Sequence, residues 1–133
     1  NFKIIDKYCI KCNSQTIQIK QNNIRKIAIA GACMMFHYNE KIRLIYDDGT
    51  IEIKSIYLDD MLSASENFLK YLYGIQKEEV EKSSHILWKG KNAENNINYY
   101  LYYDVVSIEN TKKLESIQLP DNDLMYIFAI TLY

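Results

Sequence analysis

Three cysteines and one histidine have the types and the spacing of a zinc site. Cys9 and Cys12 form a Cys-x-x-Cys pair, and Cys33 and His37 follow as a Cys-x-x-x-His pair after a gap of 20 residues. Thiolate and imidazole groups are the ligands of tetrahedral zinc, and two such pairs joined by a hairpin are typical of a zinc ribbon. The candidate ligands of a structural zinc ion are therefore Cys9, Cys12, Cys33 and His37.

The same cysteines have two other interpretations. Free cysteine is among the most buried residue types, so Cys33 fits a place in the core, with Cys9 and Cys12 near a loop by chance. Cys9-x-x-Cys12 could also be a redox pair, but such a pair usually opens a helix, whereas the residues after Cys12 have the pattern of a strand. The first pair also lacks the internal proline and the following glycine of a typical zinc knuckle.

Aromatic residues gather in the second half of the chain and indicate a binding surface. Tyr99-Tyr100 and Tyr102-Tyr103 fall in one predicted strand, and Trp88 falls in the strand before it. Strict alternation places Ile97, Tyr99, Leu101, Tyr103 and Val105 on one face, which we expect to be the core. Asn98, Tyr100, Tyr102 and Asp104 then lie on the other face. We therefore expect Trp88, Tyr100 and Tyr102 to be contact residues for a protein partner, since exposed Tyr and Trp are frequent in interfaces.

No sequence motif of an enzyme is present. The chain has two histidines, His37 and His85, and neither stands in a nucleophile motif. Its four glycines form no phosphate-binding loop of the Walker or dinucleotide type. The sequence therefore favours a non-catalytic protein, although an acid or base on Asp or Glu needs no motif.

Charge is unevenly distributed along the chain. Residues 1–43 contain eight basic and two acidic side chains, whereas the remainder contains eight basic and fifteen acidic ones. Together with the candidate zinc ligands, the basic N-terminal third predicts an alternative function, a zinc-ribbon protein that binds nucleic acid. The two parts could equally pack together and offset each other's charge.

A hairpin is predicted around Asp48-Gly49, because these residue types adopt the positive φ angles of a two-residue turn. This register places Tyr46 opposite Ile51, Leu44 opposite Ile53 and Ile42 opposite Ser55 on an apolar face.

After the hairpin, the apolar period changes to that of a helix. Leu58, Met61, Leu62, Leu69 and Leu72 share one helical stripe, and Gly74 stands where such a helix would end. Asp59 and Asp60 have the position of N-terminal capping residues. A second, shorter helix is predicted over residues 77–82.

These elements predict one α+β domain over residues 1–133, with a mainly antiparallel sheet of about eight strands and one principal amphipathic helix inserted mid-chain. The longest uncharged run, Ile27 to Asn39, is shorter than the ~20 residues that cross a bilayer, so we expect no membrane span. Three cysteines and no glycosylation sequon favour an intracellular location. A protein partner is the first expectation, and nucleic acid is the alternative one.

Overall fold

The computed structural model describes residues 2–4, 9–62, 84–109 and 111–133, and these contain strands but no helix. The ten strands are β1 (Phe2–Ile4), β2 (Ile10–Lys11), β3 (Thr16–Gln21), β4 (Lys26–Cys33), β5 (Tyr38–Tyr46), β6 (Ile51–Leu58), β7 (His85–Lys91), β8 (Asn98–Ser107), β9 (Leu114–Gln118) and β10 (Met125–Leu132).

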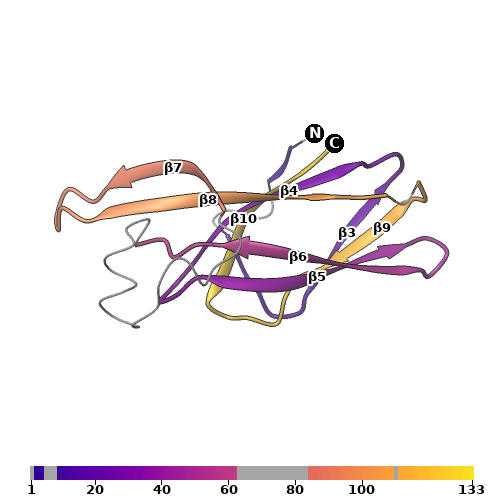
Figure 1. Cartoon of the computed structure of the whole chain (residues 1–133), viewed down its shortest axis with the longest axis horizontal. Coiled ribbons are helices and arrows are strands. Elements are labelled where there is room, and N and C mark those ends of the chain that lie inside the picture. The colour runs from indigo at the N-terminus through magenta and orange to yellow at the C-terminus, as the bar shows by residue number, and fades with distance from the viewer. Residues whose placement is uncertain (1, 5–8, 63–83, 110) are drawn as a thin grey trace.

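Two antiparallel sheets pack face to face (Figure 1). The first, sheet A, has the strand order β1-β10-β4-β8-β7, and β2 pairs with the same edge of β10 as β1 does. The second, sheet B, has the order β3-β9-β5-β6. Antiparallel pairing was predicted correctly, but the strands form two sheets where the sequence suggested one.

The predicted α+β class is wrong for the described residues, which contain no helix. The apolar pattern predicted a mid-chain helix from Leu58, but this residue belongs to a strand. Leu58 is the last residue of β6 and is fully buried in the core. Asp60 forms an isolated bridge with Cys33, and Met61 and Leu62 lie in a turn. The remainder of that helix and the one predicted over 77–82 lie outside the described residues. The predicted helical stripe therefore included Leu58, which is instead a core residue at the end of β6.

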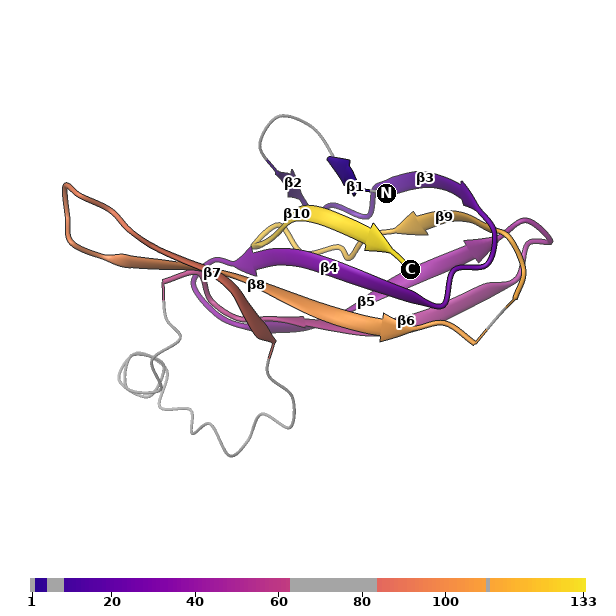
Figure 2. The same cartoon turned by 90° about the horizontal axis from the view of Figure 1, so that it is seen from above.

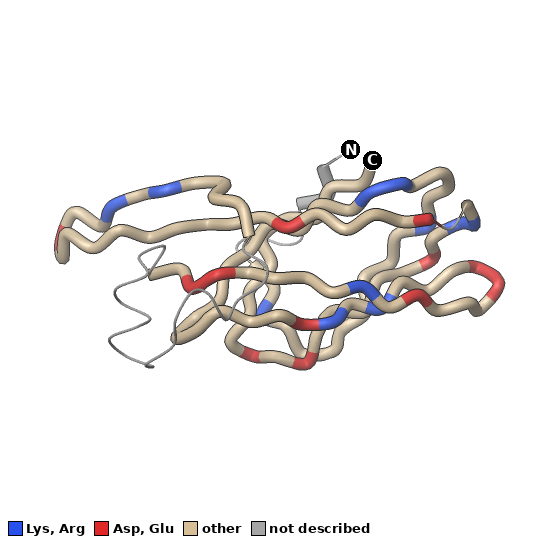
Figure 3. Tube along the Cα trace, in the orientation of Figure 1, with Lys and Arg blue, Asp and Glu red and all other residues tan. Residues whose placement is uncertain are grey.

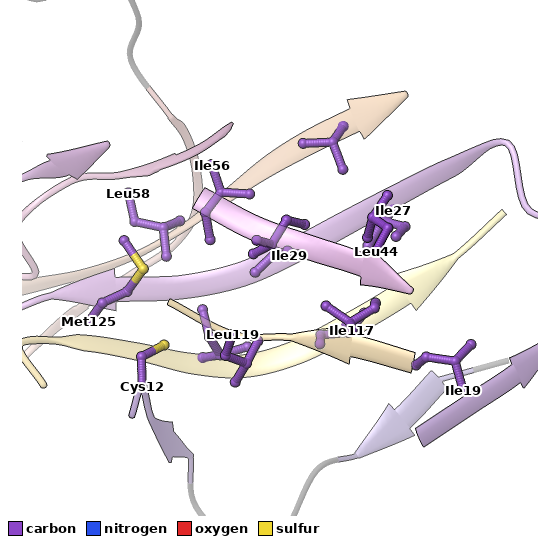
Figure 4. Close-up of a cluster of buried hydrophobic side chains, with 14 of the residues drawn as sticks. Cys12, Ile19, Ile27, Ile29, Leu44, Ile56, Leu58, Ile117, Leu119 and Met125 are labelled. Carbon is purple, nitrogen blue, oxygen red and sulfur yellow. The ribbon is translucent and has the colours of Figure 1, made fainter. Parts of the chain in front are cut away.

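The core lies between the two sheets and is dominated by isoleucine and leucine (Figure 4). Sheet A contributes Ile27, Ile29 and Met125, while sheet B contributes Leu44, Ile56, Leu58 and Ile117, all of them fully buried. Burial of one such side chain stabilises the fold by roughly 1.5–3 kcal/mol. The alternation of these residues in β4 and β5 is the reason both segments form strands with one buried face.

The hairpin between β5 and β6 forms where it was predicted, but its register differs by one residue. Ile45 pairs with Ile51 and Leu44 pairs with Glu52. The loop has three residues, because Gly49 N donates to Tyr46 O and Tyr46 N donates to Thr50 O, with Gly49 at a φ of 84°. A three-residue loop of this kind is a type I turn followed by a left-handed residue.

This shift of one residue changes the face on which the apolar side chains of β6 lie. A slip of one position moves every side chain of a strand to the other face of the sheet. Ile51 and Ile53 were predicted to be in the core, but they are 46% and 56% exposed. Glu52 and Lys54 lie on the inner side instead, where they form an ion pair at 2.7 Å and Glu52 accepts a hydrogen bond from the Tyr46 hydroxyl.

Candidate functional site

The two faces of β8 are the reverse of the sequence prediction. Tyr102 and Asp104 are 2% and 4% exposed, whereas Val105 is 39% exposed. Tyr102 and Asp104 lie directly opposite Gly31 and Ile29 of β4, which fixes them on the inner face of sheet A. Tyr99, Leu101, Tyr103 and Val105 therefore lie on the outer face, opposite to the face predicted for them. Val105 is exposed and Tyr99 and Tyr103 are half-buried there, whereas Leu101 is half-buried and still packs against the core.

Hydrogen bonds across the sandwich explain why an aspartate occupies the inner face. The Asp104 carboxylate accepts hydrogen bonds from the backbone amides of Tyr57 on β6 and of Val105, both at 2.9 Å. β6 is an edge strand of sheet B, so Asp104 provides a partner for an amide that no described strand pairs with. Nearby, the Tyr102 hydroxyl donates to the backbone oxygen of Asp60 at 3.0 Å. A buried carboxylate with amide donors is compatible with a core, and alternation of hydrophobicity does not reveal it.

The outer face of the β7–β8 hairpin carries a cluster of aromatic side chains. Trp88 pairs with Leu101, Gly90 with Tyr99, and His85 with Tyr103, so all of these residues lie on one face. The rings of His85 and Tyr103 stack at a centroid distance of 5.1 Å. We call this surface the aromatic face and define it by His85, Trp88, Tyr99, Leu101 and Tyr103.

The β7–β8 hairpin extends beyond the end of sheet B, as both views show (Figure 1 and Figure 2). Every residue of β7 is exposed except Gly90, which is half-buried. Large apolar side chains on this arm are unusually open to solvent, with Ile86, Leu87 and Trp88 each exposed by more than half. Ile86 lies on the face opposite Trp88, so both faces of the arm expose an apolar side chain. Exposed apolar side chains that gather on one part of a protein are typical of interaction sites.

Few charges lie on this arm (Figure 3). Lys89 and Lys91 are the charged residues of β7, and Glu94 lies in the loop between β7 and β8. Lys89 lies on the side opposite the aromatic face, where its Nζ is 5.6 Å from the centroid of the Tyr100 ring. The positive charge of β7 therefore lies on the face opposite the aromatic face.

The three predicted contact residues have different positions. Trp88 is 53% exposed on the aromatic face, as a contact residue should be. Tyr100 is half-buried on the inner face, where its ring stacks on that of Tyr102 at 6.2 Å. Tyr102 is buried in the core and offers no surface to a partner. The residues that sequence reasoning missed are His85, Tyr99 and Tyr103. Alternation along β8 separated the two faces correctly, but it could not show which of them is buried, because the contact of Asp104 with Tyr57 is distant in sequence.

The candidate zinc ligands do not converge in the described part of the chain. Cys12 and Cys33 are fully buried, and they lie on opposite sides of Met125 in sheet A. On one side of Met125, its backbone oxygen accepts a hydrogen bond from Cys12 N at 2.9 Å. On the other side, Met125 pairs with Cys33 of β4. Figure 4 shows Cys12 and Met125 together in the core. Two strand spacings place the Cα atoms of the two cysteines about 10 Å apart, which is too far for a disulfide bond.

Burial also affects the protonation of both thiols. The Cys33 thiol donates to the backbone oxygen of Leu58 at 3.2 Å. Burial raises the pKa of Cys12 to about 12 and raises that of Cys33 further. Among the residues described, no group of three His, Cys, Asp or Glu side chains could hold a metal ion. Zinc binding, and nucleic-acid binding through the N-terminal third, stay predictions.

His37 follows Cys33 by four residues in the sequence, and its ring packs against other aromatic rings. Its ring stacks on Phe36 at 4.1 Å and contacts Tyr57 at 5.6 Å. Its Nδ1 atom is buried and has no hydrogen-bond partner among the described residues. Burial lowers the pKa of His37, while the nearby carboxylates of Asp59 and Asp60 oppose that shift. The neutral imidazole is therefore the form that the fold favours.

Asp59 and Asp60 were predicted to cap a helix whose remaining residues lie outside the described part of the chain, and both carboxylates accept hydrogen bonds near the end of β6. The Asp59 carboxylate accepts hydrogen bonds from the Ser84 hydroxyl at 2.7 Å and from the Tyr57 hydroxyl at 3.0 Å. The Asp60 carboxylate accepts one from the Leu62 amide at 2.9 Å, and burial raises its pKa. Asp59 thereby joins the end of β6 to the start of β7, which positions the arm.

A pocket of about 250 Å³ lies away from this arm and is lined by Asn23, Ile24, Arg25, Ile108, Glu109 and Thr111. Among its described lining residues, Arg25 and Glu109 are the charged ones.

No protein-family model matches this sequence, and no curated protein matches it at a significant level. Among the described residues, no helix combines the length and the apolar character needed to cross a membrane.

Proposed function

We propose that this chain is a non-catalytic binding module that contacts a protein partner through the aromatic face of the β7–β8 arm. The observation that carries the proposal is that His85, Trp88, Tyr99, Leu101 and Tyr103 share the outer face of a hairpin that projects from the sandwich. The proposal keeps the aromatic strand face that the sequence suggests but changes the residues, since the odd-numbered tyrosines of β8 take the place of Tyr100 and Tyr102.

The composition of this face suits a protein interface. Tyr and Trp bury a large area with few rotatable bonds, and they are enriched among residues that dominate binding energy. His85 and the tyrosine hydroxyls add polar groups that can pair with a partner. Nucleic acid fits less well, because a surface that stacks bases needs a positive groove around its rings, whereas β8 brings no basic side chain to this face.

The test is site-specific photocrosslinking in cells that produce the protein. A photoreactive amino acid at position 103 should give a discrete adduct with one protein, identified by mass spectrometry. The same amino acid at position 53, where Ile53 is exposed on sheet B, is the matched control and should give no such adduct.

The identified partner is then produced in pure form, and its affinity is measured. Trp88→Ala should weaken binding by at least about thirtyfold, as expected for a residue that dominates an interface. Ile53→Ala should leave the affinity unchanged. Equal affinities for the wild-type protein and the Trp88→Ala variant would contradict the proposed function.

A further inference from the structure

We infer that the partner's contact segment is an extended peptide that alternates acidic with apolar or small residues and adds as a strand to the free edge of β7. This inference rests on the proposed function and specifies the chemistry of the partner. It follows from the pairing of β7, from the direction of its side chains, and from the sign of its charge.

The free edge of β7 is suited to strand addition. Among the described strands, β7 pairs with β8 alone, so its other edge presents backbone donors and acceptors without a described strand partner. A register shift between Ile86 and Trp88 makes Leu87 an extra residue, and beyond it residues 88–91 pair in continuous register with residues 101–98. This regular stretch is the part of the edge that a new strand could extend.

The side chains of this stretch alternate between two kinds. Trp88 and Gly90 lie on the aromatic face, while Lys89 and Lys91 lie on the other face, opposite Tyr100 and Asn98. A strand added beside β7 has its own side chains alternating in the same way. Its residues beside Lys89 and Lys91 would favour carboxylates, and its residues on the other face would pack against the Trp88 ring.

Charge decides between a foreign peptide and a second copy of this chain. β7 has two lysines and no acidic residue. Pairing two copies of β7 edge to edge would bring four lysines together without a carboxylate between them, and lysine on an edge strand is a known device against such self-association. An acidic segment converts the same lysines into favourable contacts.

The experiment uses the complete chain and a synthetic peptide of alternating valine and glutamate. Trp88 is the only tryptophan of the chain, so its fluorescence emission reports directly on contact at this face. We expect the emission to shift to shorter wavelength, and affinity to be at least about tenfold higher than for a peptide of alternating valine and lysine. Absence of binding, or equal binding of the two peptides, would overturn the inference.

Two controls separate charge and backbone pairing from other causes. Lys89→Glu combined with Lys91→Glu should reverse the preference between the peptides, whereas Lys20→Glu combined with Lys41→Glu, at exposed positions of sheet B, should not. Alternate amides of an added strand point toward β7, and the others point away from it. N-methylation of the first set should abolish binding, whereas N-methylation of the second set should not. Unchanged binding of both methylated peptides would overturn strand addition.

Other outcomes identify which proposal fails. A dimer of the free protein in sedimentation, dissociated by Trp88→Ala, would overturn the foreign peptide in favour of a second copy. If the crosslinked partner requires Trp88 but no alternating acidic peptide binds, the inference fails while the proposed function stands. If the peptide binds but position 103 gives no adduct in cells, the proposed function fails.

Discussion

The indole ring of Trp88 lies over Gly90, and a methyl group added at Gly90 would overlap the Cη2 and Cζ2 atoms of that ring. Gly90 therefore provides the space in which Trp88 lies along its own strand. Because both residues belong to the aromatic face, this contact sets the surface that a partner would meet.

Gly90→Ala should displace the Trp88 ring without damaging the fold. The ring is exposed and can rotate away, so we expect the free energy of unfolding to change by less than about 1 kcal/mol. Tryptophan emission should shift measurably in the folded state. Gly49→Ala is the matched control: its φ of 84° makes alanine strained, so it should lower stability without changing the emission. Identical emission of Gly90→Ala and the wild-type protein would show that the ring does not lie on Gly90.

Asp104→Ala should destabilise the protein, because it leaves the amide of Tyr57 without its acceptor in the core. Loss of a buried partner of this kind costs about 1–3 kcal/mol, measurable by denaturant unfolding. Asp104→Asn keeps one acceptor oxygen and should cost less. Val105→Thr, at the exposed neighbouring position, should change stability by no more than about 0.5 kcal/mol. A neutral Asp104→Ala would contradict the role assigned to this carboxylate in joining the sheets.

His37 should make the fold less stable in mild acid. Its pKa is lowered by burial, so below the ordinary value of 6.5 the unfolded chain takes up a proton that the folded chain does not. Stability contributed by neutral His37 is therefore present above pH 6.5 and is lost as the pH falls from there.

His37→Phe keeps an aromatic ring beside Phe36 and removes the buried Nδ1 atom that has no described partner. Unfolding free energies measured at several values between pH 5 and pH 7.5 should fall less steeply in this variant than in the wild-type protein. Parallel curves would refute the expectation.

The three cysteines should react at two different rates with a thiol reagent at neutral pH. Cys9 is partly exposed and should react rapidly, whereas Cys12 and Cys33 are buried and should react only as the protein opens. The raised pKa of each buried thiol reinforces this protection, since the thiolate is the reactive form. Cys9→Ser should remove the rapid phase. Three rapid thiols in the folded protein would contradict the packing of sheet A around Met125.

Local patterns predicted the strands better than they predicted their faces. The Asp48-Gly49 turn was placed correctly, because glycine with positive φ is a local requirement. Its register was not, since a three-residue and a two-residue loop differ in hydrogen bonds that the sequence does not specify. The faces of β8 were also not predictable from local sequence. Asp104 makes its inner face look polar, and the hydrogen bond that explains this burial comes from Tyr57, which is distant in sequence.

The candidate site was predicted in part. Trp88 was expected to be exposed on a strand, and it is. Tyr102 was expected on the outer face and Tyr103 on the inner one, but Tyr102 is buried and Tyr103 lies on the outer face beside His85. Projection of the arm could not be predicted, since it depends on how far β8 continues beyond sheet B. The sequence spacing of the cysteines suggested that Cys12 and Cys33 bind one metal ion. In the sheet, Met125 lies between these two residues.

The central claim is that the β7–β8 arm is the partner-binding surface, and amide hydrogen exchange of the complex tests it most directly. With the crosslinked partner bound, we predict slower exchange in residues 85–91 and 98–105 and no change in residues 51–58 of β6. Protection confined to β6, or unchanged exchange throughout the arm, would contradict the claim.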